Sequence, residues 1–192
     1  MTLSLVVTED GLEGRESLLS LLYDQVSALL EAGFGWSALP SDLRNLFCLS
    51  YYKGQVENGG HGQFMSNAAG FHGGGPARIL GWAAEGAQDL GLAETGAVIA
   101  AFQGWIDAHP DDLAALADFD IDRLPAIESL DRQLYQADRG ADAADLATMR
   151  ADAKLRAWQP RIVVGQAAFY PRLRELAQSA IGPDAPAILT RR

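Results

Sequence analysis

Residues 55–70 read Gln-Val-Glu-Asn-Gly-Gly-His-Gly-Gln-Phe-Met-Ser-Asn-Ala-Ala-Gly, and this stretch decides how the chain is divided into helices. The apolar residues of the preceding segment, 41–57, recur at helical spacing and predict a helix that ends here. The Asn-Gly-Gly triplet at 58–60 tolerates positive φ, which a tight reversal requires. A short helix at about 61–69 fits after it. We therefore expect two helices joined by a turn.

Helical spacing continues through most of the chain. Apolar residues predict helices at about 13–32, 41–57, 61–69, 76–90, 93–108, 126–138, 142–158 and 161–180, the last with a break at Pro171. Strand-like alternation is sparse, and residues 1–10 are expected to form an extended lead-in. The predicted fold class is all-α, with six to eight helices and a Gly-rich loop between helices near residues 58–75.

The composition is that of one globular protein. The chain has 192 residues, 48% hydrophobic and 21% charged, which predicts a single domain over residues 1–192. Its N-terminus lacks the basic segment of a secretory signal, and no apolar run approaches the roughly 18 residues that span a membrane. Cys48 is the only cysteine, so no internal disulfide can form. We expect a cytoplasmic protein without membrane contact.

Charge is unevenly distributed along the chain, whose net charge is -10. Residues 111–152 hold eleven acids and four bases, a balance of -7, whereas residues 153–192 hold two acids and seven bases, a balance of +5. The last segment therefore predicts a basic helix and tail at 160–192. The acidic balance argues against direct nucleic-acid binding and favours a basic partner. The simpler interpretation is that the acids are solvated helix faces and caps.

Motifs for catalysis, cofactors and metals are incomplete. His72-Gly73-Gly74-Gly75 is similar to the oxyanion loop of some esterases, but no serine has the required nucleophile-elbow setting. Residues 118–122 begin like a calcium loop and then lack its glycine and glutamate. The histidines lack the spacing of a metal site. We predict no catalytic, cofactor-binding or metal-binding residues, and the protein is expected to be no enzyme.

Two side-chain amides suggest how the glycine-rich turn is held. Gln63 and Asn67 are four residues apart and share one face of a helix. Each can donate and accept hydrogen bonds, so they can brace the backbone of residues 58–60. The alternative is that they recognise the polar groups of a ligand.

Residues 55–70 resemble the signature of a bacterial family that is called DNA-mimic-protein-like, with the approximate pattern E-V-x-N-G-G-x-x-Q-F-x-x-N-x-x-G. Residues 130–135, Leu-Asp-Arg-Gln-Leu-Tyr, resemble its weaker second element, L-D-x-x-(Y/F). The resemblance implies an all-α fold. One branch of the family is an acidic dimer that imitates DNA and binds a transcription factor. The signature positions, structural or binding, are Glu57, Asn58, Gly59, Gly60, Gln63, Phe64, Asn67 and Gly70.

These observations lead to a non-enzymatic, acidic protein-binding module as the main hypothesis. It would meet a basic surface, either of a DNA-binding regulator or of a toxin, and a homodimer is left open. The mimic's acids lie outside the shared signature, so the resemblance carries none of them over. The candidate interface acids of this chain are Asp118, Asp120, Asp122 and Asp138.

The runner-up hypothesis is a small-ligand-binding protein or enzyme with a pocket beside the loop at Asn58–Gly75. Its polar lining would be Glu57, His61, Gln63, Asn67 and His72. A third possibility is an accessory structural protein with no assignable biochemical activity.

Overall fold

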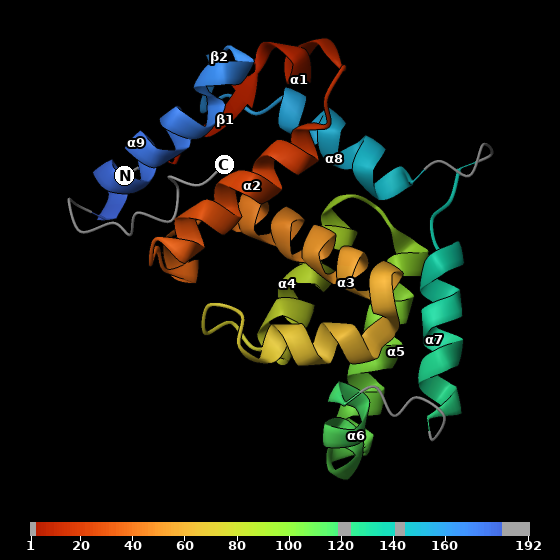
Figure 1. Cartoon of the computed structure of the whole chain (residues 1–192). Coiled ribbons are helices and arrows are strands. Elements are labelled where there is room, and N and C mark those ends of the chain that lie inside the picture. Colours follow the sequence, from red (N-terminus) through yellow and green to blue (C-terminus); the bar gives the residue numbers. More distant parts are fainter. Residues whose placement is uncertain (1–2, 119–123, 141–144, 182–192) are drawn as a thin grey trace. The chain divides into compact units, whose positions relative to one another are not determined.

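The chain folds almost entirely into helices (Figure 1), in a computed structural model that describes residues 3–118, 124–140 and 145–181. Its elements are β1 (Leu5–Thr8), α1 (Glu9–Glu13), α2 (Leu18–Glu31), α3 (Ser41–Ala69), α4 (Pro76–Asp89), α5 (Ala93–Ala108), α6 (Leu113–Ala117), α7 (Pro125–Gln136), α8 (Leu146–Arg156), β2 (Arg161–Val164) and α9 (Phe169–Ile181). Among the described residues, seven α-helices have eleven residues or more, and strands are confined to β1 and β2. The predicted all-α class is confirmed.

The chain divides into two compact units. The first unit comprises residues 1–47 and 148–192, and the second comprises residues 48–147. Helix α3 begins in the first unit and continues into the second, and α8 begins at the end of the second unit. Organisation of the whole chain as a single domain stays a prediction.

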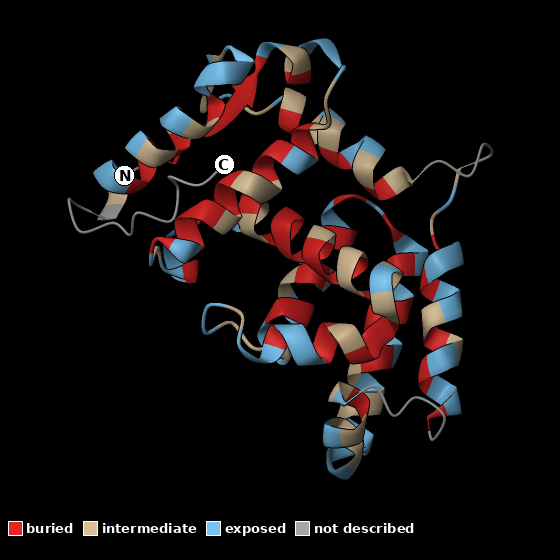
Figure 2. Ribbon diagram, in the orientation of Figure 1, coloured by how far each residue is buried: buried red, intermediate tan, exposed pale blue. Residues whose placement is uncertain are grey.

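The first unit is built around β1, whose four residues are all buried and are drawn red in Figure 2. One edge of β1 pairs in parallel with β2, with Leu5 opposite Arg161. At the other edge the Val6 N–H donates to the Gln25 side-chain oxygen (2.7 Å), and the Gln25 amide donates to the Ser4 carbonyl (2.8 Å). A side chain of α2 thus satisfies backbone groups that a further strand would otherwise pair.

The prediction of a helix over residues 161–180 is wrong at its start. Residues Arg161–Val164 form β2, and α9 begins only at Phe169. The three consecutive β-branched residues of β2 favour an extended chain, and pairing with the buried β1 satisfies the backbone groups of Ile162 and Val164. Pro171 is the third residue of α9, and an N–H at this position has no partner within the helix. The predicted break at Pro171 is therefore absent. Residues 182–192 of the predicted basic tail lie outside the described residues.

Other helix limits follow the sequence more closely. Helix α5 has the predicted bounds, Ala93–Ala108. The helix predicted from residue 13 instead begins at Leu18, because Gly14 (φ 83°) ends a separate short helix, α1, which the sequence pattern did not indicate. The extended lead-in predicted at residues 1–10 contains β1, but its last two residues, Glu9 and Asp10, already belong to α1.

The second unit buries apolar faces of α3, α4, α5 and α7. Helices α4 and α5 pack as a hairpin, and α7 lies against α5. The buried side chains include Phe64 of α3, Ile79 and Leu80 of α4, Val98, Ile99 and Phe102 of α5, and Ile127, Leu130 and Leu134 of α7. Within the described residues, no helix is both long enough and apolar enough to cross a membrane.

The contact between Gln25 and β1 gives a stability test. Replacing Gln25 by Leu keeps a similar volume but leaves the buried Val6 N–H without its acceptor. We expect Gln25→Leu to lower the free energy of unfolding by about 1–3 kcal/mol in urea denaturation. Gln178→Leu, at an exposed position of α9, is the matched control and should change it by less than about 0.5 kcal/mol. Equal stability of the two variants would contradict this role of Gln25.

Candidate functional site

The family-like segment forms an interruption in α3. Gly59 (φ -167°, ψ 26°) and Gly60 (φ 74°, ψ -177°) leave helical geometry, so that α3 consists of two helical halves. Gly60 needs its positive φ, and a side chain there would also meet the Asp131 carboxylate, 2.6 Å from the Cβ position. The predicted turn at 58–60 is present. It consists of two non-helical residues, Gly59 and Gly60, and not of a longer loop.

Helix α7 holds both sides of this interruption. The Asp131 carboxylate accepts the backbone N–H of His61 (2.8 Å), the residue with which the second half of α3 begins. The Tyr135 hydroxyl donates to the carbonyl of Glu57 (2.6 Å), near the end of the first half. Asp131 and Tyr135 lie one helical turn apart on α7 and face the same way. We call this pair the clasp, because it satisfies backbone groups that the break would leave unpaired.

A buried chain of polar side chains starts from the clasp. The His61 ring has no exposed surface, and its Nδ1 lies in hydrogen-bond contact with the Asp131 carboxylate. Its Nε2 lies 2.8 Å from the Tyr52 hydroxyl, and its ring packs against Phe102 with centroids 4.1 Å apart. The tautomer in which Nδ1–H donates to the Asp131 carboxylate leaves Nε2 to accept from the Tyr52 hydroxyl, so that both contacts are satisfied at once.

The order Asp131–His61–Tyr52 is similar to a catalytic triad in its connectivity but not in its access to solvent. Tyr52 is completely buried. Burial, and secondarily the negative charge of Asp131, raises the pKa of the Tyr52 phenol far above its ordinary value. A phenol that stays protonated and cannot meet a substrate is a poor nucleophile. The arrangement is suited to holding α3 and α7 together.

The two halves of α3 fold back on each other (Figure 1), and side chains of the first half contact residues of the second half and of the turn that follows it. Tyr51 in the first half stacks on Phe71, which follows the end of α3, with ring centroids 4.4 Å apart. Closer to the break, the Gln55 side-chain oxygen accepts the amides of Asn67 (2.6 Å) and Gln63 (3.0 Å).

The predicted bracing by Gln63 and Asn67 is therefore different in detail. Both amides donate to the Gln55 side chain in the first half of α3. Gln63 also lies against Gly59, where an added side chain would overlap it. The amides thus hold one helical half against the other, and the absence of a side chain at Gly59 gives Gln63 its space.

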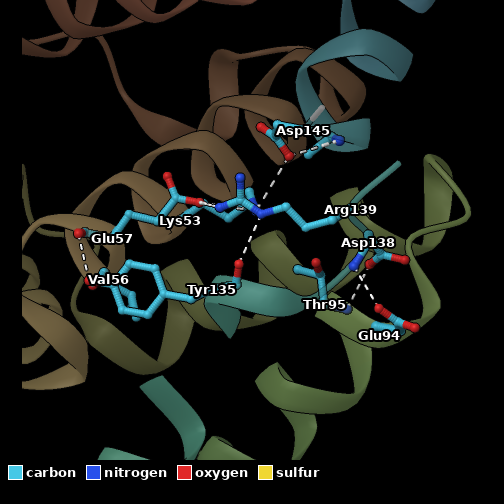
Figure 3. Close-up of polar contacts among 10 residues, drawn as sticks. Lys53, Val56, Glu57, Glu94, Thr95, Tyr135, Asp138, Arg139 and Asp145 are labelled. Atoms are coloured by element: carbon cyan, nitrogen blue, oxygen red, sulfur yellow. Dashed lines mark hydrogen bonds and ion pairs between the residues drawn. The ribbon is translucent and has the colours of Figure 1, made fainter. Parts of the chain in front are cut away.

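A cluster of charges lies beside the clasp (Figure 3). Lys53 is only 5% exposed, and its ammonium group lies 3.4 Å from the Glu57 carboxylate and 3.6 Å from that of Asp145. The Arg139 guanidinium approaches Glu57 (3.9 Å) and donates to the Tyr135 carbonyl (2.9 Å). A buried ammonium group requires such partners. The carboxylates of Glu57 and Asp145 therefore stabilise the buried charge of Lys53.

Asp138, one of the candidate interface acids, caps α5 from a distance (Figure 3). Its carboxylate accepts the Thr95 N–H (2.8 Å) in the first turn of α5, and its own N–H donates to the Glu94 carboxylate (2.7 Å). The preceding N-cap residue, Leu92, has no side chain that can cap. This reciprocal pair also holds Asp138 at φ 49°, a conformation that few residues other than glycine adopt.

Side chains predicted to line a ligand pocket are divided among different partners. Glu57 pairs with Lys53, His61 with Asp131 and Tyr52, and Gln63 and Asn67 with Gln55, whereas His72 is exposed and packs on Phe71. Of the remaining signature positions, Asn58 and Gly70 are exposed and Phe64 is fully buried. In the described part of the chain, no three His, Cys, Asp or Glu side chains are grouped to hold a metal ion.

Other acids are placed differently from Asp138. Asp118 is exposed at the end of α6, and Asp120 and Asp122 lie outside the described residues. Asp107 and Asp111, at the end of α5 and just after it, are also exposed. Within the described residues, Asp111 and Asp118 take part in no ion pair. These carboxylates, unlike Asp131 and Asp138, face solvent.

The side chains that contact the signature were not predicted from its pattern. Asp131 and Tyr135 belong to the second family-like element, and their i, i+4 spacing was a usable signal that they share a face. Gln55 begins the signature itself. Nothing local marks Tyr52, which is one of several aromatic residues on α3.

A family model described as DMP19-like protein matches residues 37–158, which include both family-like elements. Because this match covers more than half of the chain, the protein belongs to the DMP19-like protein family, and the predicted DNA-mimic-like membership is confirmed. No curated protein and no solved structure matches the chain.

Two glycines of α3 provide a matched test of the interruption. Gly60→Ala introduces strain at positive φ and a contact with Asp131, so we expect it to lower the free energy of unfolding by at least about 2 kcal/mol. Gly54→Ala lies in the first half, where no atom is close to the added methyl group. It should leave stability unchanged or raise it by about 0.5–1 kcal/mol. Urea denaturation of both variants measures the difference, and similar values would refute the geometry described for Gly60.

The two classes of acid can be separated in the same way. Asp138→Ala removes the cap of α5, so we expect the free energy of unfolding to fall by about 1–2 kcal/mol. Asp118→Ala should change it by less than about 0.5 kcal/mol, because its carboxylate is exposed. Thermal and urea unfolding of the two variants give this comparison. A destabilised Asp118→Ala, or an unaffected Asp138→Ala, would reverse the assignment.

Proposed function

We propose that the protein is a non-enzymatic binding module whose exposed carboxylates meet a basic surface of another protein, in the manner of a DNA mimic. Family membership supports this proposal. The observation that carries it is the exposure of Asp118, together with Asp107 and Asp111, on a stretch without compensating charge. Residues 79–122 contain nine acids and no Lys or Arg.

Charge arrangement favours a partner with clustered Lys or Arg. Like-charged carboxylates on one stretch attract a basic protein over several ångströms and raise its rate of association. A surface that binds the phosphate backbone of DNA has such clusters. A DNA-binding regulator is therefore the partner that we propose, and a basic toxin is the other kind of protein that would fit.

The proposed interface consists of Asp118, Asp120 and Asp122. Asp138 is the fourth candidate acid, but its carboxylate caps α5 through the Thr95 N–H. Replacing it would therefore change stability as well as charge. The interface is thus better tested without altering Asp138.

The test is affinity capture on the immobilised protein from an extract of its host cells. We expect wild-type protein to retain a basic DNA-binding protein at low salt and to release it as salt rises, because salt screens exposed charges. The triple variant Asp118→Asn, Asp120→Asn and Asp122→Asn should lose it. Double-stranded DNA added in solution should compete for a regulator.

The matched control is the triple variant Glu9→Gln, Glu13→Gln and Glu31→Gln, which neutralises three exposed acids in the first unit. It should retain the same protein as the wild type. If both triple variants lose the partner equally, net charge alone accounts for binding. If the Asp118, Asp120 and Asp122 variant captures the same proteins as the wild type, the proposed interface is wrong.

A further inference from the structure

We propose that the outer edge of β2 binds an extended acidic peptide segment, which adds to the two-stranded sheet as a third strand. This surface belongs to the first unit, and the inference does not rest on the proposed function. Among the described residues, the sheet contains β1 and β2 alone.

The register of the sheet defines which backbone groups are available. Leu5 is opposite Arg161, and the Leu5 N–H donates to the Pro160 carbonyl (2.8 Å). In a parallel ladder this register turns the backbone groups of Ile162 and Val164 toward β1. The N–H and C=O of Val163 consequently point to the opposite edge.

The two edges of the sheet differ in whether their backbone groups have hydrogen-bond partners. The outer edge of β1 is closed, since the Val6 N–H donates to the side chain of Gln25. In the part of the chain that the structure describes, nothing equivalent covers the outer edge of β2. Val163 is 47% exposed, although it is a large apolar residue. Proteins commonly protect an open edge with a charge, a proline or a bulge. Val163 itself has none of these: the charge of β2 is Arg161 at its first position, and Pro160 lies before the strand.

The positive charge of the residues around β2 in the sequence favours an acidic peptide. Residues 153–181 contain five Lys or Arg and one acid, Glu175. Arg161, at the start of β2, belongs to this excess. A second copy of β2 would bring like charges together, whereas an acidic peptide would meet the opposite charge. Addition of a strand supplies affinity through main-chain hydrogen bonds, and the charges supply preference.

Val163→Pro tests the edge selectively. The N–H that proline removes points away from β1, so the ladder between the two strands keeps its hydrogen bonds. Val163→Thr is the matched control because it keeps the N–H and a β-branched side chain. Circular dichroism and thermal unfolding of both variants establish that they are folded.

The probe is a short fluorescent peptide in which Asp alternates with Val, and its binding is followed by fluorescence anisotropy. We expect wild type and Val163→Thr to bind it at low salt. Val163→Pro should bind about tenfold more weakly, which corresponds to the loss of the one main-chain hydrogen bond that the Val163 N–H donates to the peptide. A peptide with Lys in place of Asp should also bind at least about tenfold more weakly.

Each of the following results would overturn the proposal. Equal binding by wild type and Val163→Pro would exclude the edge, and equal binding of the Lys peptide would exclude the charge preference. Sedimentation that shows a dimer of the wild type, dissociated by Val163→Pro, would assign the edge to a second copy instead. If Val163→Pro does not fold, the Asp peptide with alternate backbone nitrogens methylated replaces it. That peptide should lose binding to the wild type, and retained binding would contradict the proposal.

Discussion

The hydrogen bond from the His61 N–H to the Asp131 carboxylate is the contact on which the second unit depends. A helix that stops and restarts leaves backbone donors and acceptors unpaired at the break, and burying such groups without partners is costly. The Asp131 carboxylate on α7 accepts the backbone N–H at the start of the second half of α3, and it also contacts the His61 ring. The ring in turn positions Tyr52, so a local defect in α3 becomes a long-range connection between α3 and α7.

The same solution recurs at other helix starts. Asp152 accepts the Leu19 N–H at the start of α2 (2.8 Å), Asp131 accepts that of His61, and Asp138 accepts that of Thr95 at the start of α5. All three are acids of the segment 111–152, and a fourth, Asp145, pairs with Lys53. Part of the negative charge of this segment therefore supports helix starts, which are electropositive. The exposed acids, such as Asp111 and Asp118, are the ones that remain for a partner.

Local sequence was sufficient for the all-α class, for the bounds of α5 and for the turn at Gly59 and Gly60, because periodicity and glycine act over a few residues. It was insufficient for the partners of that turn. Asp131 lies 70 residues from His61, and no local pattern relates the two. β2 was missed for a similar reason, since its β-branched residues become a strand only against the distant β1. Gln63 and Asn67 were predicted to bond to the backbone of residues 58–60, but their amides donate to the Gln55 side chain. The folding back of α3 brings Gln55 next to them.

The folded-back form of α3 also limits how this segment can change in evolution. Tyr51 and Phe71, Gln55 and Asn67, and Gly59 and Gln63 are each placed symmetrically about His61 in the sequence. One inserted residue between Gln63 and Asn67 would rotate everything after it by about 100° around the helix axis, since a turn has 3.6 residues. Asn67 and Phe71 would then leave their partners together. The spacing of the signature is for this reason as constrained as its residue types, whereas length changes at Gly73–Gly75, beyond the last pair, would leave these contacts in register.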